Sequence, residues 1–168
     1  MKISMIGYHG TDRSAAINIT KTQNFKISNK KNEWLGKGVY FYELLEKASW
    51  WASNNKDSVV LKTPINVEHD KLVDLDLPSE EDKFGKFIRE MENSGTYIFD
   101  KDEVRRRCQL INMYMEYIDS HVTVATLPST NPKYKNEFNQ IGYIRTEKQI
   151  CVHNTDCIVY NEIEEIEI

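Results

Sequence analysis

The amino-acid sequence predicts one α+β domain over residues 1–168, in which helices flank an antiparallel sheet. Apolar residues recur at helical spacing in the first two thirds of the chain, whereas strand-like segments dominate after Pro132. The composition is globular, with 40% hydrophobic and 29% charged residues. No repeat, low-complexity tract or long linker divides the chain, and its length suits a single core.

The N-terminal segment predicts a strand followed directly by a helix. Residues 3–8 are a short buried strand that ends at His9 and Gly10. Thr11 or Asp12 can cap the following helix, because both side chains accept hydrogen bonds from free backbone amides. The helix directs three apolar residues inward, namely Ala15, Ala16 and Ile19.

The next segments alternate between extended chain, loop and helix. Residues 25–28 are extended, and residues 29–38 form a polar, glycine-containing loop. A strand over residues 39–42 then leads into a helix over residues 43–54. Residues 59–67 are extended, and Pro64 places this strand near a sheet edge, since proline lacks the amide that a central strand needs.

Two further helices have clear start signals. Ser79 is the expected cap of the first helix, and Gly95 ends it. Asp100 is the expected cap of the second, which carries an apolar stripe. The stripe consists of Val104, Cys108, Ile111, Met115 and Ile118. Arg105, Arg106 and Arg107 are interpreted as its solvated face, with a phosphate-binding patch as the alternative.

The C-terminal part predicts two strands within residues 142–154 and 156–168. They are joined by an expected turn at Asn154 and Thr155, and their pairing closes the fold.

Charge and hydrophobicity narrow the function classes. A net charge of −4 argues against tight, non-selective nucleic-acid binding, although a nucleic acid remains possible as a briefly held substrate. The longest apolar run is far shorter than the roughly 20 residues that span a bilayer. The N-terminus lacks the apolar region of a signal peptide. We therefore expect a cytoplasmic protein without a membrane partner.

The thiols and imidazoles do not predict a metal centre. Cys108, Cys151 and Cys157 are scattered and odd in number, which favours reduced, buried thiols. The sequence holds no CxxC or HExxH motif, and the four histidines lie far apart. No metal is expected.

Two aromatic residues 11 positions apart suggest a slot for a flat ring. Tyr40 lies on the strand of residues 39–42 and Trp51 on the helix that follows, so their rings can converge. Two aromatic faces clamp a heteroaromatic ring well, and a cationic ring better still. The alternative is that Trp51 belongs to the core, because it shares a helical stripe with Leu44 and Ala48.

His9 and Gly10 suggest a site for an amide and a sugar at the end of the first strand. A residue without a side chain lets a ligand approach the backbone closely, and backbone N–H and C=O groups can bind a carboxamide. The imidazole then has a ring nitrogen for a ribose hydroxyl. A lone histidine can equally be a hydrogen-bonded core residue.

These motifs, "YHGT" at residues 8–11 and "GKGVYFYELLEKASWWA" at residues 36–52, resemble the NAD-binding core of ADP-ribosyltransferases of the poly(ADP-ribose) polymerase and diphtheria-toxin type. The resemblance covers residues 8–52 and about 145–160, under half of the chain. It implies a split antiparallel sheet with flanking helices. It also implies NAD as co-substrate, held by His9, Gly10, Thr11, Tyr40 and Trp51. Ala48 stands where the family has a hydroxyl residue that binds the carboxamide.

The resemblance also implies a catalytic glutamate at the start of a late strand. The best match, Gln149 to His153, places glutamine at that position. A carboxylate there stabilises the oxocarbenium-like transition state of glycosidic cleavage, and a neutral amide does so less well. Glu147 lies two residues earlier on the same strand face, and could activate the acceptor or reach the ribose. The alternative is that both are ordinary polar residues of a wet strand face.

The leading hypothesis is an NAD-dependent mono-ADP-ribosyltransferase, with Gln149 and Glu147 at the reacting bond and His9 and Tyr40 beside them. Arg145 could neutralise the pyrophosphate or pair with Glu147. By analogy, a small single domain suggests a bacterial toxin of a toxin–antitoxin or phage-defence system. Its partners would then be a protein or nucleic-acid acceptor and an antitoxin. The alternatives are an inactive NAD- or ADP-ribose-binding module and an NAD glycohydrolase.

Overall fold

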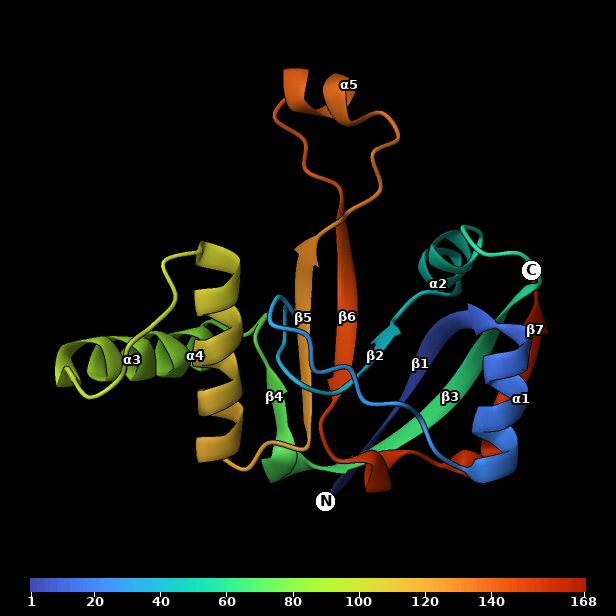
Figure 1. Cartoon of the computed structure of the whole chain (residues 1–168), viewed down its shortest axis with the longest axis horizontal. Helices are drawn as coiled ribbons and strands as arrows, with labels where there is room; N and C mark the ends of the chain where they lie inside the picture. The colour runs from blue at the N-terminus through green and yellow to red at the C-terminus, as the bar shows by residue number, and fades with distance from the viewer.

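A seven-stranded sheet in the order β4-β5-β6-β2-β1-β3-β7 organises the chain in the computed structural model, which describes residues 1–168 (Figure 1). Neighbouring strands are antiparallel, except for β4 and β5, which are parallel. The strands are β1 (Lys2–Asp12), β2 (Val39–Tyr42), β3 (Ser58–Glu68), β4 (Leu72–Asp74), β5 (Val122–Pro128), β6 (Thr146–Val152) and β7 (Glu164–Glu167). The predicted α+β class is confirmed.

The sheet is weakly joined in its middle. β1 and β3 pair along their whole length, from Lys2 opposite Glu68 to Asp12 opposite Ser58. By contrast, β1 and β2 share one register pair, Tyr8 opposite Tyr42. Two well-paired halves, β4-β5-β6-β2 and β1-β3-β7, therefore meet at a short contact and separate beyond it.

Five α-helices surround the sheet: α1 (Arg13–Thr22), α2 (Leu45–Ala52), α3 (Pro78–Ser94), α4 (Glu103–Tyr117) and α5 (Lys135–Gln140). One hydrophobic cluster packs Ala16 and Ile19 of α1 against Phe41 of β2. A second cluster packs Phe87 of α3 and Ile111 of α4 against β5 and β6. Helices thus bury both ends of the sheet (Figure 1). None of them combines the length and hydrophobicity that crossing a bilayer requires.

The helix starts agree in part with the sequence. Asp12, one of the two predicted caps, caps α1 by accepting a hydrogen bond of 2.8 Å from the Ala15 amide. The predicted Asp100 cap of α4 is wrong, because Asp102 accepts the Arg105 amide instead and Asp100 binds the Asp102 amide. The predicted Ser79 cap is also wrong: α3 begins at Pro78, whose fixed φ suits the first helical turn.

Helix α2 is shorter than predicted, and its buried face is narrower. The predicted stripe of Leu44, Ala48 and Trp51 is not a core stripe, since Leu44 precedes the helix and both Leu44 and Trp51 are exposed. Only Ala48 and Ala52 are buried. Small residues are required there, because the helix lies directly against β1.

Several elements were not predicted, and the closing strand lies elsewhere. β5 is a central strand with four consecutive buried residues, so it lacks the alternation that marks a half-exposed strand. The expected turn at residues 154–155 is a short 3-10 helix over Thr155–Cys157. From there the chain crosses to the other edge, where β7 pairs with β3 and not with β6. Pro64 lies in the part of β3 that β7 leaves uncovered, near an edge as predicted.

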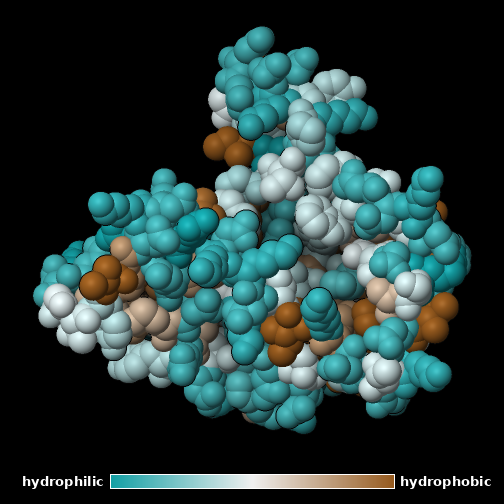
Figure 2. Space-filling view, viewed as in Figure 1, coloured by the Kyte–Doolittle hydropathy of each residue, from teal (hydrophilic) through white to brown (hydrophobic).

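Residues 129–145 form an arm that projects from the β5–β6 pair and carries α5 near its tip (Figure 1). Figure 2 shows this lobe standing clear of the body, with weakly polar side chains gathered beneath it. Phe138 and Tyr143 pack together within the arm, with ring centroids 4.9 Å apart. The arm leads directly into β6.

Candidate functional site

His9 lies where β1 and β2 separate, and its imidazole bridges the two strands. Nδ1 is 2.8 Å from the carbonyl oxygen of Tyr40. Because a carbonyl only accepts, Nδ1 carries the proton and Nε2 is left as an acceptor. The ring packs edge-on against Phe25 and lies beside Phe41, with centroid distances of 5.2 and 5.6 Å. Nε2 has no hydrogen-bond partner in the protein.

Burial keeps His9 and His153 neutral. It lowers the pKa of both imidazoles, against the opposing effect of their hydrogen bonds to the carbonyls of Tyr40 and Lys37. His153 is held from two sides, by Lys37 O at 2.7 Å and by the Thr123 hydroxyl at 2.9 Å.

These two histidines predict a loss of stability in mild acid. The unfolded chain binds protons as the pH falls through the ordinary histidine pKa of 6.5, whereas the folded protein does not until the lowered values are reached. We expect the thermal midpoint to fall between about pH 7 and pH 5, above the range in which carboxylates titrate. Replacing His153 with Gln should flatten this dependence, and replacing exposed His69 with Asn should not. Parallel pH profiles for these two variants would contradict the assignment.

Tyr40 is anchored through its hydroxyl. The hydroxyl donates to the Gly36 carbonyl at 2.6 Å and accepts from the Leu35 amide at 3.0 Å. Burial raises the pKa of the phenol, so it stays protonated. The ring packs against the cluster beneath α4, whereas His9 packs against the other cluster with Phe41. The two side chains therefore lie on opposite faces of the sheet and are joined through the Tyr40 carbonyl.

Gly10 allows α2 to lie against β1. A Cβ at this position would be 2.6 Å from the Ala48 carbonyl oxygen and 2.9 Å from the Ala52 Cβ. The space left by the missing side chain is thus occupied by α2. The opposite side of α2 reaches β6, where Lys47 Nζ donates to the Thr146 carbonyl at 3.2 Å. Helix α2 therefore bridges the two halves of the sheet.

Trp51 lies on the outer side of α2 and is 49% exposed. Its ring is 6.5 Å from that of Trp50, so two indoles sit side by side on this helix. Thr11 lies near the end of β1, half-buried, opposite Val59 of β3. Trp51 has a free aromatic face, and Tyr40 has its hydroxyl fixed in the protein.

Glu147 is the most unusual group of the site. The side chain points inward from β6, the residue is 4% exposed, and one carboxylate oxygen accepts from Gln149 Nε2 at 2.8 Å. The other oxygen, Oε2, is buried without any partner. Burial and the nearby Glu147 carboxylate both raise the pKa of Tyr42. Since Gln149 is directly opposite Tyr42, these three residues form one group on the sheet.

An unpartnered buried carboxylate oxygen costs free energy, because it has lost its hydration without gaining a hydrogen bond. Such a group is a candidate for binding a ligand hydroxyl or a developing cation. It lies on β6 close to the separation of β1 and β2, and it is the strongest candidate for chemistry in the molecule.

Other predicted or neighbouring polar residues lie outside this group. Arg145 belongs to the arm, where its guanidinium donates to the Lys133 carbonyl at 3.3 Å and lies over the Phe138 ring. Lys148 points to the opposite face from Glu147 and pairs with Asp76 at 3.1 Å. The histidine, cysteine and acidic side chains form no group of three or more that could hold a metal ion.

Two functional candidates were missed in the sequence. Tyr42 follows Tyr40 on the same strand face, so the alternation of a strand could have indicated it. Arg107 was interpreted as part of a solvated face, yet its guanidinium lies 3.5 Å above the Trp34 ring and its Nε is buried without a partner. No local pattern indicates that contact, because it joins α4 to a loop more than 70 residues earlier.

Comparison with known proteins adds little to this description. No protein-family model matches the chain. An uncharacterized protein of Methanocaldococcus jannaschii is 33% identical to the chain over 81 residues. The match covers 44% of this chain and 38% of that protein, so the chain matches well under half of its relative's length. The similarity carries no functional information.

Proposed function

We propose that this chain is an NAD-dependent mono-ADP-ribosyltransferase that transfers ADP-ribose to a macromolecular acceptor. The observation that carries the proposal is the buried carboxylate of Glu147, with one oxygen bound by Gln149 and the other unpartnered. The His9–Tyr40 bridge at the separation of β1 and β2 supports it, as does the resemblance of "YHGT" and "GKGVYF" to this enzyme class.

The reaction breaks the bond between the nicotinamide nitrogen and ribose C1′. Nicotinamide leaves as a neutral base with the bonding electrons, and positive charge develops on the sugar. A fixed carboxylate stabilises this charge without reorganising, most effectively where water is excluded. The acceptor nucleophile then forms the new bond to C1′ and loses a proton, for which a carboxylate is a suitable base. In this proposal Glu147 performs both roles.

Gln149 has a positioning role in this scheme. Its amide donates to Glu147 Oε1, so it orients the carboxylate and leaves Oε2 without a protein partner. This assigns the charge to Glu147 and the orientation to Gln149, the reverse of the order that the resemblance implies. His9 lies on the other face of the sheet and supports the site through its hydrogen bond to the Tyr40 carbonyl, whereas Trp51 offers an aromatic face for the nicotinamide ring.

Incubating the protein with cell extract and with NAD that is labelled in its adenylate part distinguishes transfer of ADP-ribose from binding alone. Label fixed in a macromolecule, with nicotinamide released in equal amount, is the expected result. A second candidate, a binding module without turnover, is favoured by the neutral Gln149 at the expected catalytic position. It predicts tight NAD binding without nicotinamide release. Release without labelled acceptor would instead indicate an NAD glycohydrolase.

As a toxin, the protein should slow growth when its expression is induced in a bacterial host. The expected effect is growth arrest with the wild-type chain and normal growth with the Glu147→Gln variant at equal protein levels, because only the former consumes NAD or modifies its acceptor. Growth curves, immunoblots and NAD levels measure this. Arrest by both proteins would show that toxicity does not depend on the carboxylate.

A further inference from the structure

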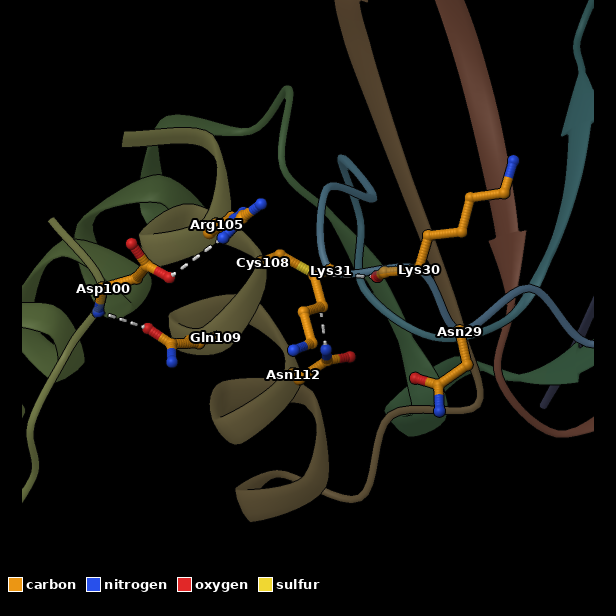
Figure 3. Close-up of a pocket in the computed structure, with 8 residues that line it drawn as sticks. All are labelled: Asn29, Lys30, Lys31, Asp100, Arg105, Cys108, Gln109 and Asn112. Atoms are coloured by element: carbon orange, nitrogen blue, oxygen red, sulfur yellow. Dashed lines mark hydrogen bonds and ion pairs between the residues drawn. The ribbon is translucent and has the colours of Figure 1, made fainter. Parts of the chain in front are cut away.

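A polar groove lies between α4 and the loop that precedes β2, as Figure 3 shows. It has a volume of about 370 Å³. Arg105, Gln109 and Asn112 line it from the helix, and Asn29, Lys30 and Lys31 line it from the loop, where the Lys31 side chain extends toward Asn112 and that of Lys30 points away from α4.

The groove carries positive charge in a chain that is negative overall. Lys30 and Lys31 have no acidic partner within ion-pair distance, and Arg105 forms a long ion pair of 3.9 Å with Asp100, the single carboxylate of the groove. Arg106, by comparison, is neutralised by Glu92 on α3. A local excess of cations against a net charge of −4 marks this surface as selective for an anionic partner.

The loop of the groove leads directly into β2, which carries Tyr40 and Tyr42. The loop is fastened to α4 where the Cys108 thiol bonds to the Lys30 carbonyl and where Asn112 Oδ1 accepts from the Lys37 amide at 2.7 Å. Next to Cys108, Arg107 stacks on Trp34, and burial lowers the pKa of the Arg107 guanidinium. The loop that lines the groove also carries Leu35 and Gly36, which hold the Tyr40 hydroxyl.

We propose that this groove, formed by residues 29–31 and the first turns of α4, binds the phosphate backbone of a single-stranded nucleic acid that serves as the ADP-ribose acceptor. The identity of the acceptor rests on the proposed transferase function, whereas binding in the groove is measured without NAD. Three cations are too few for an extended duplex footprint, but they suit a short single-stranded segment held for transfer.

The lining favours a nucleic acid over a protein acceptor. Protein interfaces depend on apolar and aromatic anchors in their centre, and this groove offers one apolar group, Cys108. Nucleic-acid interfaces are polar and positively charged, with amides that bind phosphate and sugar oxygens. Lysine, arginine and asparagine side chains provide this chemistry here.

Fluorescence anisotropy tests the proposal with labelled single-stranded DNA and RNA of about 12 nucleotides, a usual site size for single-strand binders. For three phosphate contacts we expect a slope of log K against log salt of roughly −2. The variant Lys30→Glu/Lys31→Glu should lower affinity about tenfold or more. It should also reduce the magnitude of the slope to less than about 1. The matched control Lys21→Glu/Lys56→Glu changes the net charge equally on exposed residues elsewhere, and should bind nearly as the wild type does.

The outcomes distinguish nucleic-acid binding in the groove from the proposed transferase activity. Oligonucleotide binding that depends on Lys30 and Lys31 supports the groove, even if no nicotinamide is released. Equal losses in both double variants, or preferential binding of a poly-glutamate peptide, would overturn it. If label from NAD is fixed only in protein, the nucleic-acid acceptor is wrong while the transferase function stands. Circular dichroism of both variants verifies that they are folded.

Discussion

Replacing Glu147 with Gln is expected to abolish most of the turnover while leaving the fold intact. The amide has the same shape and still accepts the Gln149 hydrogen bond, but it brings no charge to the sugar. The expected loss of nicotinamide release is on the order of 100-fold to 1,000-fold, the effect of removing one preorganised electrostatic contact to a transition state. The thermal midpoint should stay the same or rise, because a buried unpartnered carboxylate oxygen is replaced by a neutral group.

Two further variants make this result specific. Glu43→Gln removes an exposed carboxylate at the end of β2 and should retain full activity. Gln149→Glu places a second carboxylate within hydrogen-bonding distance of the first, and the pair would share a proton, so we expect a slower enzyme at neutral pH. A faster Gln149→Glu enzyme, together with an active Glu147→Gln variant, would transfer the catalytic role to position 149.

Gly10→Ala is expected to have the second large effect, on stability and activity together. The added Cβ would meet the Ala48 carbonyl and the Ala52 Cβ at 2.6 and 2.9 Å, and neither can rotate away because both belong to a helix packed on the strand. We expect a loss of about 1–3 kcal/mol in the free energy of unfolding, as for overpacking elsewhere. Because α2 also contacts β6 through Lys47, its displacement should disturb the Glu147 region as well.

A matched glycine shows whether the close approach is the cause. A Cβ at Gly85, on α3, would meet nothing within 4 Å. Gly85→Ala should therefore stabilise the protein by about 0.5–1 kcal/mol, since alanine loses less backbone entropy in a helix. Urea unfolding of both variants measures the difference. Equal stability of Gly10→Ala and the wild type would mean that α2 does not lie against β1.

Parts of the fold could be predicted because their signals are local. The strand over residues 39–42, the helix after Asp12 and the stop at Gly95 depend on capping and on the period of apolar residues within a few positions. β5 and β7 could not be predicted in this way. The first is buried without alternation, and the position of the second depends on where the chain crosses after Ile158, which bridges Ile65 of β3.

The candidate site, too, could be predicted from the sequence only in part. Its residue types could be selected from the sequence: the His9–Gly10 pair, Tyr40, and the Glu147–Gln149 pair on one strand face. Their geometry could not. The Tyr40 hydroxyl is fixed by Leu35 and Gly36 of the adjacent loop. Helix α2 packs on Gly10 and Trp51 remains exposed, and both depend on packing between segments that are distant in the sequence.

The sequence by itself determined the fold class, the first strand–helix unit and which side chains were candidates for a site. Only the tertiary structure decided which carboxylate is buried with an oxygen that has no hydrogen-bond partner. Strand alternation places Glu147 and Gln149 on one face, but the burial of Glu147 Oε2 arises from the elements around β6. Desolvation is a property of the whole fold, because it depends on which distant atoms exclude water, and no local pattern of residues encodes it.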